Sequence, residues 1–213
     1  MVSKVQRSND FQEITFGRRS VKAYDPEVKI SREEMTEILS EASRAPSSVN
    51  LQPWRFVVIE SEEGKAKLAP LARFNQTQVA TSAAAIAIFM DMNNKEHLDE
   101  IYTKAAELGY MPHDVMSSQL KAIHGYYDQL SNEALRDVNL IDSGLVAMQL
   151  MLVARAHGYD TNPIGGYEKD QIAEAFGLDK ERYQPVMLVT IGKAAKEGYP
   201  SYRLPVETTT VWK

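Results

Sequence analysis

The stretch FGRRSVKAYDP contains three cations and a hydroxyl group within five consecutive residues: Arg18, Arg19, Ser20 and Lys22. Arginine presents a planar fork that matches phosphate oxygens, and lysine presents a point charge. The whole chain has 24 basic and 29 acidic side chains, so this local excess of positive charge is unusual for it. Short charged runs are also common on solvated turns. The run therefore indicates either a site for a phosphate group or an exposed basic turn.

Three further stretches place polar or glycine residues where a ligand could meet them. PSSVNLQPW, residues 46–54, holds two serines, an asparagine and a glutamine, which can cap a helix end or line a polar ligand. NPIGG, residues 162–166, has two glycines that allow close approach of the backbone to a flat ligand, or simply precede a helix. SYRLP places a second arginine, Arg203, near the end of the chain. Each stretch alone leaves both interpretations open.

Several common kinds of site are not indicated by the sequence. It has no cysteine, no GxxxxGK[ST] loop, no GxGxxG turn and no nucleophile elbow. Its histidines lack the spacing of a metal site, so no metal is predicted. His157 follows an apolar run and is instead expected to end a helix. The histidines are His97, His113, His124 and His157.

Composition and charge narrow the partners and the location. The formal net charge is −5, which gives no excess of basic charge for nucleic acid. The first 17 residues contain no apolar run long enough for a signal peptide. The longest apolar stretches, 83–90 and 145–156, are too short or too interrupted to span a bilayer. We therefore expect a cytoplasmic protein that contacts neither nucleic acid nor membrane.

The apolar patterns predict a helix-rich α+β fold around a sheet of few strands. Helices are expected at 10–16, at 31–45 with Ser31 as N-cap, at 61–74 on the surface, and at 138–156 as a buried central helix. Strands are expected at 54–60, 83–91 and 184–192, with a further β-prone run at 207–212. Residues 159–178 are interpreted as a Pro/Gly turn that leads into another helix. Residues 94–130, broken at Gly109, Pro112 and Gly125, are expected to form two or three helices of a lid-like excursion.

Five stretches taken in order resemble the FMN-dependent nitroreductase family. They are RRSVKAY, PSSVNLQPW, FNQTQV, NPIGGY and SYRLP. The resemblance implies a single domain over 1–213 with a nitroreductase-like fold and a central mixed or antiparallel sheet. It implies an intertwined homodimer with C-terminal strand exchange, in which residues 193–213 extend to the partner subunit. It also implies tightly bound FMN at the subunit interface, with NAD(P)H as co-substrate.

The resemblance also implies roles for individual residues. Arg18 and Ser20 would contact the FMN phosphate or ribityl chain with Arg19 nearby, and Arg203 with Ser201 would lie on the far side of the phosphate. Lys22 would lie near flavin N1, where a cation stabilises the reduced state. Residues 46–50 would reach the flavin from the partner subunit. No protein residue is catalytic, because flavin N5 carries the hydride, with Lys22 and Gly165 in support. The implied cofactor-binding residues are Arg18, Arg19, Ser20, Lys22, Pro46, Ser47, Ser48, Asn50, Asn75, Gln78, Pro163, Ile164, Gly165, Gly166, Ser201 and Arg203.

Two positions depart from what some family members have. Gly165 stands where some carry an acidic residue, so only a backbone role is implied there. Gln78 stands where some carry a lysine, and one cation fewer would make reduced flavin a slightly better donor. We expect Gln78→Lys to raise the flavin midpoint potential, and a redox titration would measure it.

The expected function is ping-pong hydride transfer from NAD(P)H through FMN to nitroaromatics, quinones or similar small acceptors. Two alternatives also bind flavin: a sensor or interaction protein without turnover, and a reductive dehalogenase or flavin-degrading member of the same fold family. A plain α+β domain without a cofactor is the remaining interpretation.

Overall fold

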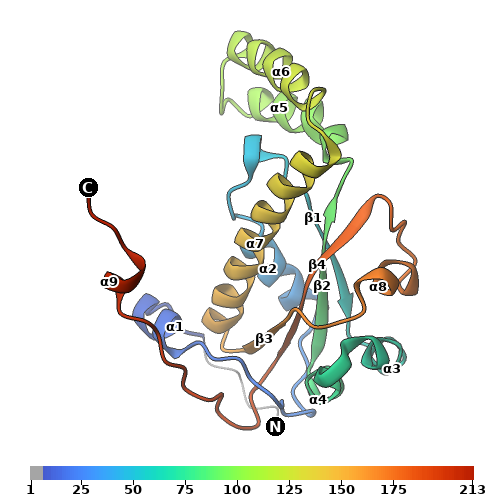
Figure 1. Cartoon of the computed structure of the whole chain (residues 1–213), viewed down its shortest axis with the longest axis vertical. Coiled ribbons are helices and arrows are strands. Elements are labelled where there is room, and N and C mark those ends of the chain that lie inside the picture. Colours follow the sequence, from blue (N-terminus) through green and yellow to red (C-terminus); the bar gives the residue numbers. More distant parts are fainter. Residues whose placement is uncertain (1–6) are drawn as a thin grey trace.

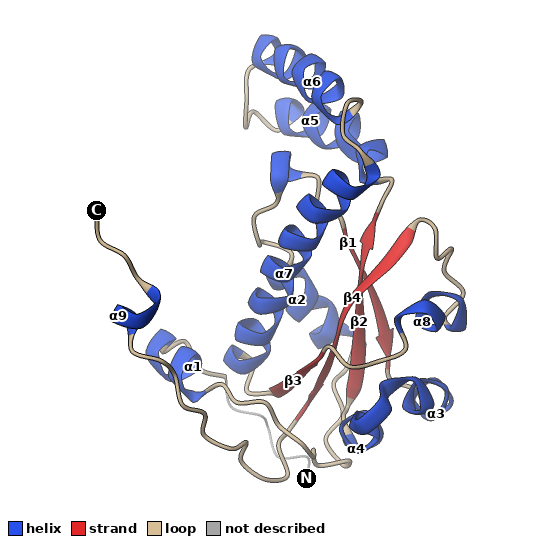
Figure 2. Ribbon diagram, in the orientation of Figure 1, coloured by secondary structure: helices blue, strands red, loops and turns tan. Residues whose placement is uncertain are grey.

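The computed structural model describes residues 7–213 and contains a four-stranded antiparallel sheet with the strand order β1-β2-β4-β3 (Figures 1 and 2). Three strands confirm the expected apolar runs: β1 (Trp54–Ile59), β2 (Ala84–Asp91) and β4 (Tyr183–Gly192). The fourth is β3 (Asp160–Ile164), which pairs only with β4 and lies at the edge. Residues 1–6, where the segment considered for a signal peptide begins, lie outside the described residues.

Helices cover both faces of the sheet (Figure 2). The helices α2 and α7 lie on one face, packed against Ile86, Ile88 and Val189, and α3, α4 and α8 lie on the other, against Ala87 and Phe89. Since β2 is buried along its whole length, its run of apolar residues on both faces is explained. The helical elements in this body are α1 (Phe11–Gly17), α2 (Arg32–Ala42), η1 (Ser48–Asn50), α3 (Glu62–Leu68), η2 (Ala69–Asn75), α4 (Gln76–Thr81), α7 (Asn132–Ala156), α8 (Lys169–Ala175) and α9 (Val206–Thr209).

The helix ends follow the expected capping residues. The Ser31 side chain accepts a hydrogen bond from the Glu34 amide and caps α2. Helix α7 is capped by Ser131 at its start and ends at His157, as expected, before Gly158 at φ 85°. By length and composition α7 could span a membrane, a property it shares with core helices of soluble proteins. Here it packs along α2 and the sheet as a core helix.

The predicted excursion forms a separate projection at one end of the molecule (Figure 1). It consists of η3 (Asn94–His97), α5 (Leu98–Glu107) and α6 (His113–Tyr127), as the composition indicated. Gly109, with φ 74°, follows α5 as expected, but Gly125 lies inside α6 and breaks nothing. The excursion has its own small core, in which Leu98, Tyr102 and Tyr127 pack together.

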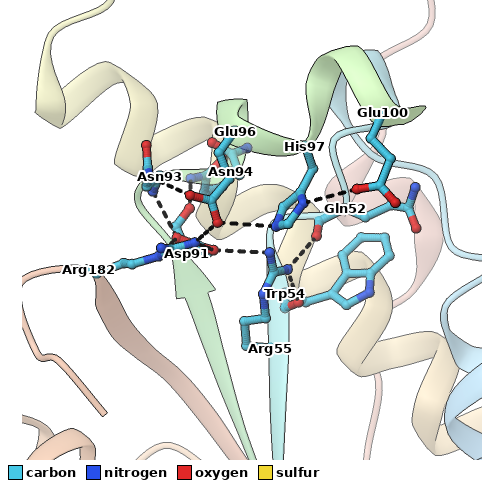
Figure 3. A network of polar contacts seen from close by, with 11 residues as sticks. Gln52, Trp54, Arg55, Asp91, Asn93, Asn94, Glu96, His97, Glu100 and Arg182 are labelled. Carbon is cyan, nitrogen blue, oxygen red and sulfur yellow. Dashed lines mark hydrogen bonds and ion pairs between the residues drawn. The ribbon is translucent and has the colours of Figure 1, made fainter. Parts of the chain in front are cut away.

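An ion network around the buried carboxylate of Asp91 joins the base of the excursion to the sheet (Figure 3). Asp91, at the end of β2, is fully buried and receives two hydrogen bonds of 2.8 Å from Arg182. Arg55 of β1 lies 3.0 Å from the same carboxylate, and Arg182 also pairs with Glu96 of η3. Burial acts to raise the pKa of Asp91, but the hydrogen bond from Arg182, that from the Asn93 amide and the two arginine charges hold it below its usual value.

Three sequence expectations are wrong in detail. Residues 160–164 are a strand and not a turn; proline is tolerated because β3 is an edge strand. The expected helix 61–74 is divided into α3 and η2, where Pro70 occupies the start of η2. The β-prone run 207–212 forms no strand, because Val206–Thr209 make a helical turn and the residues after it have no regular structure.

Candidate functional site

The cationic segment 18–22 lies along the edge of the sheet. Ser20 forms a parallel bridge with Thr161 of β3, and the Val21 amide donates to the Thr161 carbonyl over 3.1 Å. This pairing brings Ser20 and Lys22 beside the strand that leads to Gly165 and Gly166. Both glycines are exposed, and nothing lies within 4 Å of where a Cβ would stand on either. The backbone of this turn is therefore accessible to a flat ligand.

The C-terminal tail brings the second arginine to the same place. The tail runs beside residues 19–25, with a bridge between Tyr24 and Ala194. A Cβ on Gly198 would lie 2.5 Å from the Cβ of Arg19, so only glycine allows this close approach. Arg203 donates to Ser201 Oγ over 2.7 Å. The predicted pair Ser201 and Arg203 is thus held together on the tail.

The arginines form a cationic cluster without an acidic partner for Arg18. Its Nη1 atom is buried and has no hydrogen-bond partner among the described residues. Burial lowers the pKa of Arg18, and the nearby charges of Arg203 and Arg19 lower it further. A buried guanidinium nitrogen without a hydrogen-bond partner is costly. An anionic group such as a phosphate would satisfy this atom and offset the repulsion.

The start of α4 completes this edge. Gln78 Nε2 donates to Asn75 Oδ1 over 2.9 Å, so the two predicted amides act as a fixed pair. Arg73 pairs with Glu168 at 2.8 Å, and the Glu168 amide donates to the carbonyl of Leu71. These contacts hold the glycine turn beside the segment that precedes α4. The first group of site residues is therefore Arg18, Arg19, Ser20, Lys22, Asn75, Gln78, Pro163, Ile164, Gly165, Gly166, Ser201 and Arg203.

The remaining predicted residues form a second group elsewhere in the chain: Pro46, Ser47, Ser48 and Asn50. The Ser48 amide donates to Asp142 in α7 over 3.0 Å. Residue 142 is on the order of 20 Å along α7 from the end of the helix that leads to β3, at 1.5 Å per residue. The described hydrogen bonds of this group go to α7, to the excursion and within its own loop. One chain does not bring the two groups together.

Two residues of the site were missed from the sequence. Thr161 is buried, with a hydroxyl that has no partner among the described residues, directly beside Ser20. It stands one residue before the NPIGG stretch, which was the available signal. Gly198 is needed for the contact between the tail and Arg19, and an isolated glycine in a polar tail gives no such indication.

Among the described residues, two clusters of carboxylates and a histidine have a geometry that could hold a metal ion: Glu37, Glu41 and His157, and Asp91, Glu96 and His97. In both, an arginine already neutralises the acids, with Arg7 2.7 Å from Glu37 and Arg182 2.8 Å from Asp91. The charge in these clusters is therefore balanced by the protein itself.

The fold and the first group define the chain as a helix-covered antiparallel α+β protein with a cationic cluster and an exposed glycine turn at one sheet edge. The sequence profile of the nitroreductase family matches residues 16–193. The chain is 67% identical over 207 residues to YdgI of Bacillus subtilis (strain 168), assigned as an NAD(P)H nitroreductase, covering 97% of this chain and 99% of YdgI. The chain belongs to the nitroreductase family, which confirms the expected family and an oxidoreductase enzyme.

Solved structures agree with this assignment. A protein of Exiguobacterium sibiricum 255-15, assigned as a nitroreductase and crystallised in complex with FMN, matches with a TM-score of 0.96 and 64% identity, over 98% of this chain and 100% of that one. A protein of Staphylococcus epidermidis ATCC 12228, SE1966, assigned as an NAD(P)H:FMN oxidoreductase, matches with a TM-score of 0.97 and 46% identity over 100% of both chains. The expected nitroreductase-like fold is confirmed.

Proposed function

We propose that this chain is an FMN-dependent NAD(P)H oxidoreductase that reduces nitroaromatics, quinones or similar small acceptors in a ping-pong cycle. The observation that carries the proposal is the buried Nη1 of Arg18, which has no partner among the described residues and lies in a cluster with Arg19 and Arg203. An unsatisfied cation of this kind fits the phosphate of FMN. The FMN complex of a relative that is 64% identical supports the same ligand.

The first group would hold the two ends of the cofactor differently. The arginines, with Ser20 and Ser201, would bind the phosphate end. Lys22 would place a positive charge at the ring, where charge builds up on reduction. The Asn75–Gln78 pair and the backbone of Gly165 and Gly166 would supply hydrogen bonds along the ring. When bound, FMN supplies the chemistry at N5, which accepts a hydride from NAD(P)H and passes it to the acceptor.

The second group would come from another copy of the chain. Residues 46–50 are distant from the first group along α7, and α7 exposes an apolar face with Leu140, Ile141, Leu145 and Met148. Exposed apolar side chains also lie on α1 and along the tail, including Phe16, Tyr202 and Trp212. Large apolar side chains exposed in this number are typical of a protein interface. We therefore place two FMN sites at the interface of a homodimer, each completed by the partner's loop.

The test is stopped-flow reduction of the purified protein with NADH and with NADPH, followed by a panel of acceptors. We expect a yellow protein with bound FMN whose absorbance is bleached by at least one nucleotide and restored by an acceptor. Bound flavin that neither nucleotide bleaches would contradict turnover and favour a sensor. A colourless protein that takes up no FMN would overturn the whole proposal.

A further inference from the structure

The loop 46–53 has a strained backbone. Three of its residues that are not glycine have positive φ: Val49 at 43°, Asn50 at 57° and Gln52 at 48°. The left-handed region is costly for most side chains, and a β-branched residue such as Val49 is a clear outlier there. Strain of this kind persists only when the surrounding structure over-determines it. The contacts of the loop therefore show what holds it.

One hydrogen bond that holds the loop comes from helix α7. Asp142 is only 5% exposed, and its carboxylate accepts the Ser48 amide over 3.0 Å. Burial raises the pKa of Asp142, while the hydrogen bond from Ser48 acts in the opposite direction. A buried carboxylate is retained at a cost, which a hydrogen bond to the loop offsets in part.

The excursion, residues 94–130, supplies two further hydrogen bonds to the loop. The Tyr102 hydroxyl of α5 donates to the Val49 carbonyl over 3.3 Å, and the Tyr127 hydroxyl of α6 donates to Ser48 Oγ over 3.4 Å. Leu51, 1% exposed, packs in the small core of the excursion with Tyr102 and Tyr127. The apolar side of the loop is thus part of the excursion's core. Asn50 itself stays exposed.

We propose that Tyr102, Tyr127 and Asp142 are positioning residues that hold the loop in this strained conformation, and so set FMN affinity through Asn50. The proposal rests on the proposed function, in which the loop completes the partner's flavin site. It gives the excursion α5–α6 a second role besides any contact with acceptors. Without the hydrogen bonds from these three residues, Val49 would relax to negative φ and Asn50 would move away from the flavin.

The first experiment removes the two hydroxyls in the variant Tyr102→Phe/Tyr127→Phe. We expect the dissociation constant for FMN to rise about tenfold, since two hydrogen bonds to the loop are lost. Asp142→Ala is expected to act in the same direction. The matched controls are Tyr126→Phe, whose ring is 58% exposed beside Tyr127, and Asp137→Ala on the same helix, which is largely exposed. Both controls should bind FMN like the wild type.

The second experiment is a rescue. Asparagine adopts the left-handed region more readily than valine, so Val49→Asn lowers the backbone strain at residue 49, and fewer hydrogen bonds are needed to hold the loop. Added to the double tyrosine variant, it should return FMN affinity to within about threefold of wild type. A general loss of stability would not be repaired in this way. Wild-type affinity in the double variant, or a loss that Val49→Asn does not recover, would overturn the proposal.

Hydrogen exchange separates this proposal from the proposed function, because it needs no flavin. In the protein without FMN, amide protection over residues 46–53 should fall in the tyrosine variant and in Asp142→Ala, and stay unchanged in both controls. Unchanged protection would overturn the positioning role. If the wild type bound no FMN, but the loop still lost amide protection in the tyrosine variant and in Asp142→Ala, the proposed function would fail. The role of these residues in holding the loop would stand.

Discussion

Arg18 has the most unusual environment of the predicted site residues, because its partly buried guanidinium faces two like charges. If the phosphate of FMN satisfies it, Arg18→Ala should weaken FMN much more than riboflavin, which has no phosphate. Loss of a charge-assisted hydrogen bond predicts a rise of about 10- to 100-fold in the dissociation constant for FMN. Titration of each flavin, followed by quenching of flavin fluorescence, measures both constants.

Arg44→Ala is the matched control for this comparison. Arg44 is exposed just after α2 and lies outside both groups of site residues. It should leave both constants unchanged. An equal loss of FMN and riboflavin in Arg18→Ala would contradict a phosphate contact.

Asn50 provides a second residue-level prediction. Its side chain is exposed on the loop 46–53, and in the proposed dimer it reaches the partner's flavin. Asn50→Ala should raise the dissociation constant for FMN about fivefold, the equivalent of one hydrogen bond, while the fold stays intact. Affinity by fluorescence titration and melting by circular dichroism measure the two effects.

Alanine at position 50 also adds strain, because the residue has φ 57°. Asn50→Gly removes the same amide at a position where glycine is at ease. Both variants should lose FMN affinity to a similar extent. A loss in the alanine variant alone would assign the effect to the backbone, and unchanged affinity in both would leave the loop as a helix-end connector only.

At the scale of elements, the apolar patterns of the sequence predicted those strands whose position depends on burial alone. The run behind β2 is buried along its whole length and those behind β1 and β4 are buried or half-buried, so composition was sufficient. The strand β3 was missed because Asn162 and Pro163 are typical of turns, and only its place at the sheet edge makes proline acceptable. Helix α7 is apolar nearly all round, yet part of that surface is exposed in one chain, and no pattern within a sequence separates these cases.

At the candidate site too, some features could be predicted from the sequence and others could not. The five stretches gave sixteen predicted site residues, and twelve of them lie along one edge of the sheet. The separation of residues 46–50 from that edge follows from the length of α7 and was implied only by the family resemblance. The positive φ of Val49 depends on contacts from residues 102, 127 and 142, which are far away in sequence. Strain held by tertiary contacts is not encoded locally.

The ion network at the base of the excursion predicts a specific response to acid. The pKa of Asp91 lies below its unfolded value, so its stabilising contribution is complete above about pH 4 and is lost as the pH falls through the lowered folded-state pKa. Asp91→Asn should lower the free energy of unfolding by about 3 kcal/mol at pH 7, because Arg55 and Arg182 lose their buried partner. Urea unfolding at pH 7 and at pH 3 should show this difference shrinking in acid.

Asp137→Asn is the control for this measurement, because Asp137 is largely exposed and 3.9 Å from its nearest cation. Such pairs contribute little to stability. A difference between Asp91→Asn and wild type that stays constant from pH 7 to pH 3 would show that the network does not depend on the Asp91 charge.

At the scale of the whole molecule, one chain leaves much of its apolar surface uncovered. Ile141 is 67% exposed on α7, and Trp212 is 88% exposed on the tail that extends from the body (Figure 1). A second copy related by two-fold symmetry would cover the same surface on both chains. It would also bring the second group of one chain to the first group of the other, which no folding of a single chain achieves here.

This shared site predicts complementation between two defective variants. In a heterodimer of Arg18→Ala and Asn50→Ala, one site takes residue 18 from the first chain and residue 50 from the second, and so contains both defects. The other site contains neither. By two-fold symmetry, the heterodimer, purified through two different tags, should bind about one FMN per dimer with wild-type affinity. Titration of the heterodimer and of each homodimer measures this directly.

A heterodimer of Arg18→Ala and Arg203→Ala is the matched control. Both arginines belong to the first group of the same chain, as the effect of Arg203 on Arg18 shows. Each site of this heterodimer then has one defect, and neither should bind with wild-type affinity. If Arg18→Ala and Asn50→Ala also failed to restore a site, residues 18 and 50 would not serve one flavin across the interface. Restoration in the first pair and not in the second would establish that each flavin is bound by two chains.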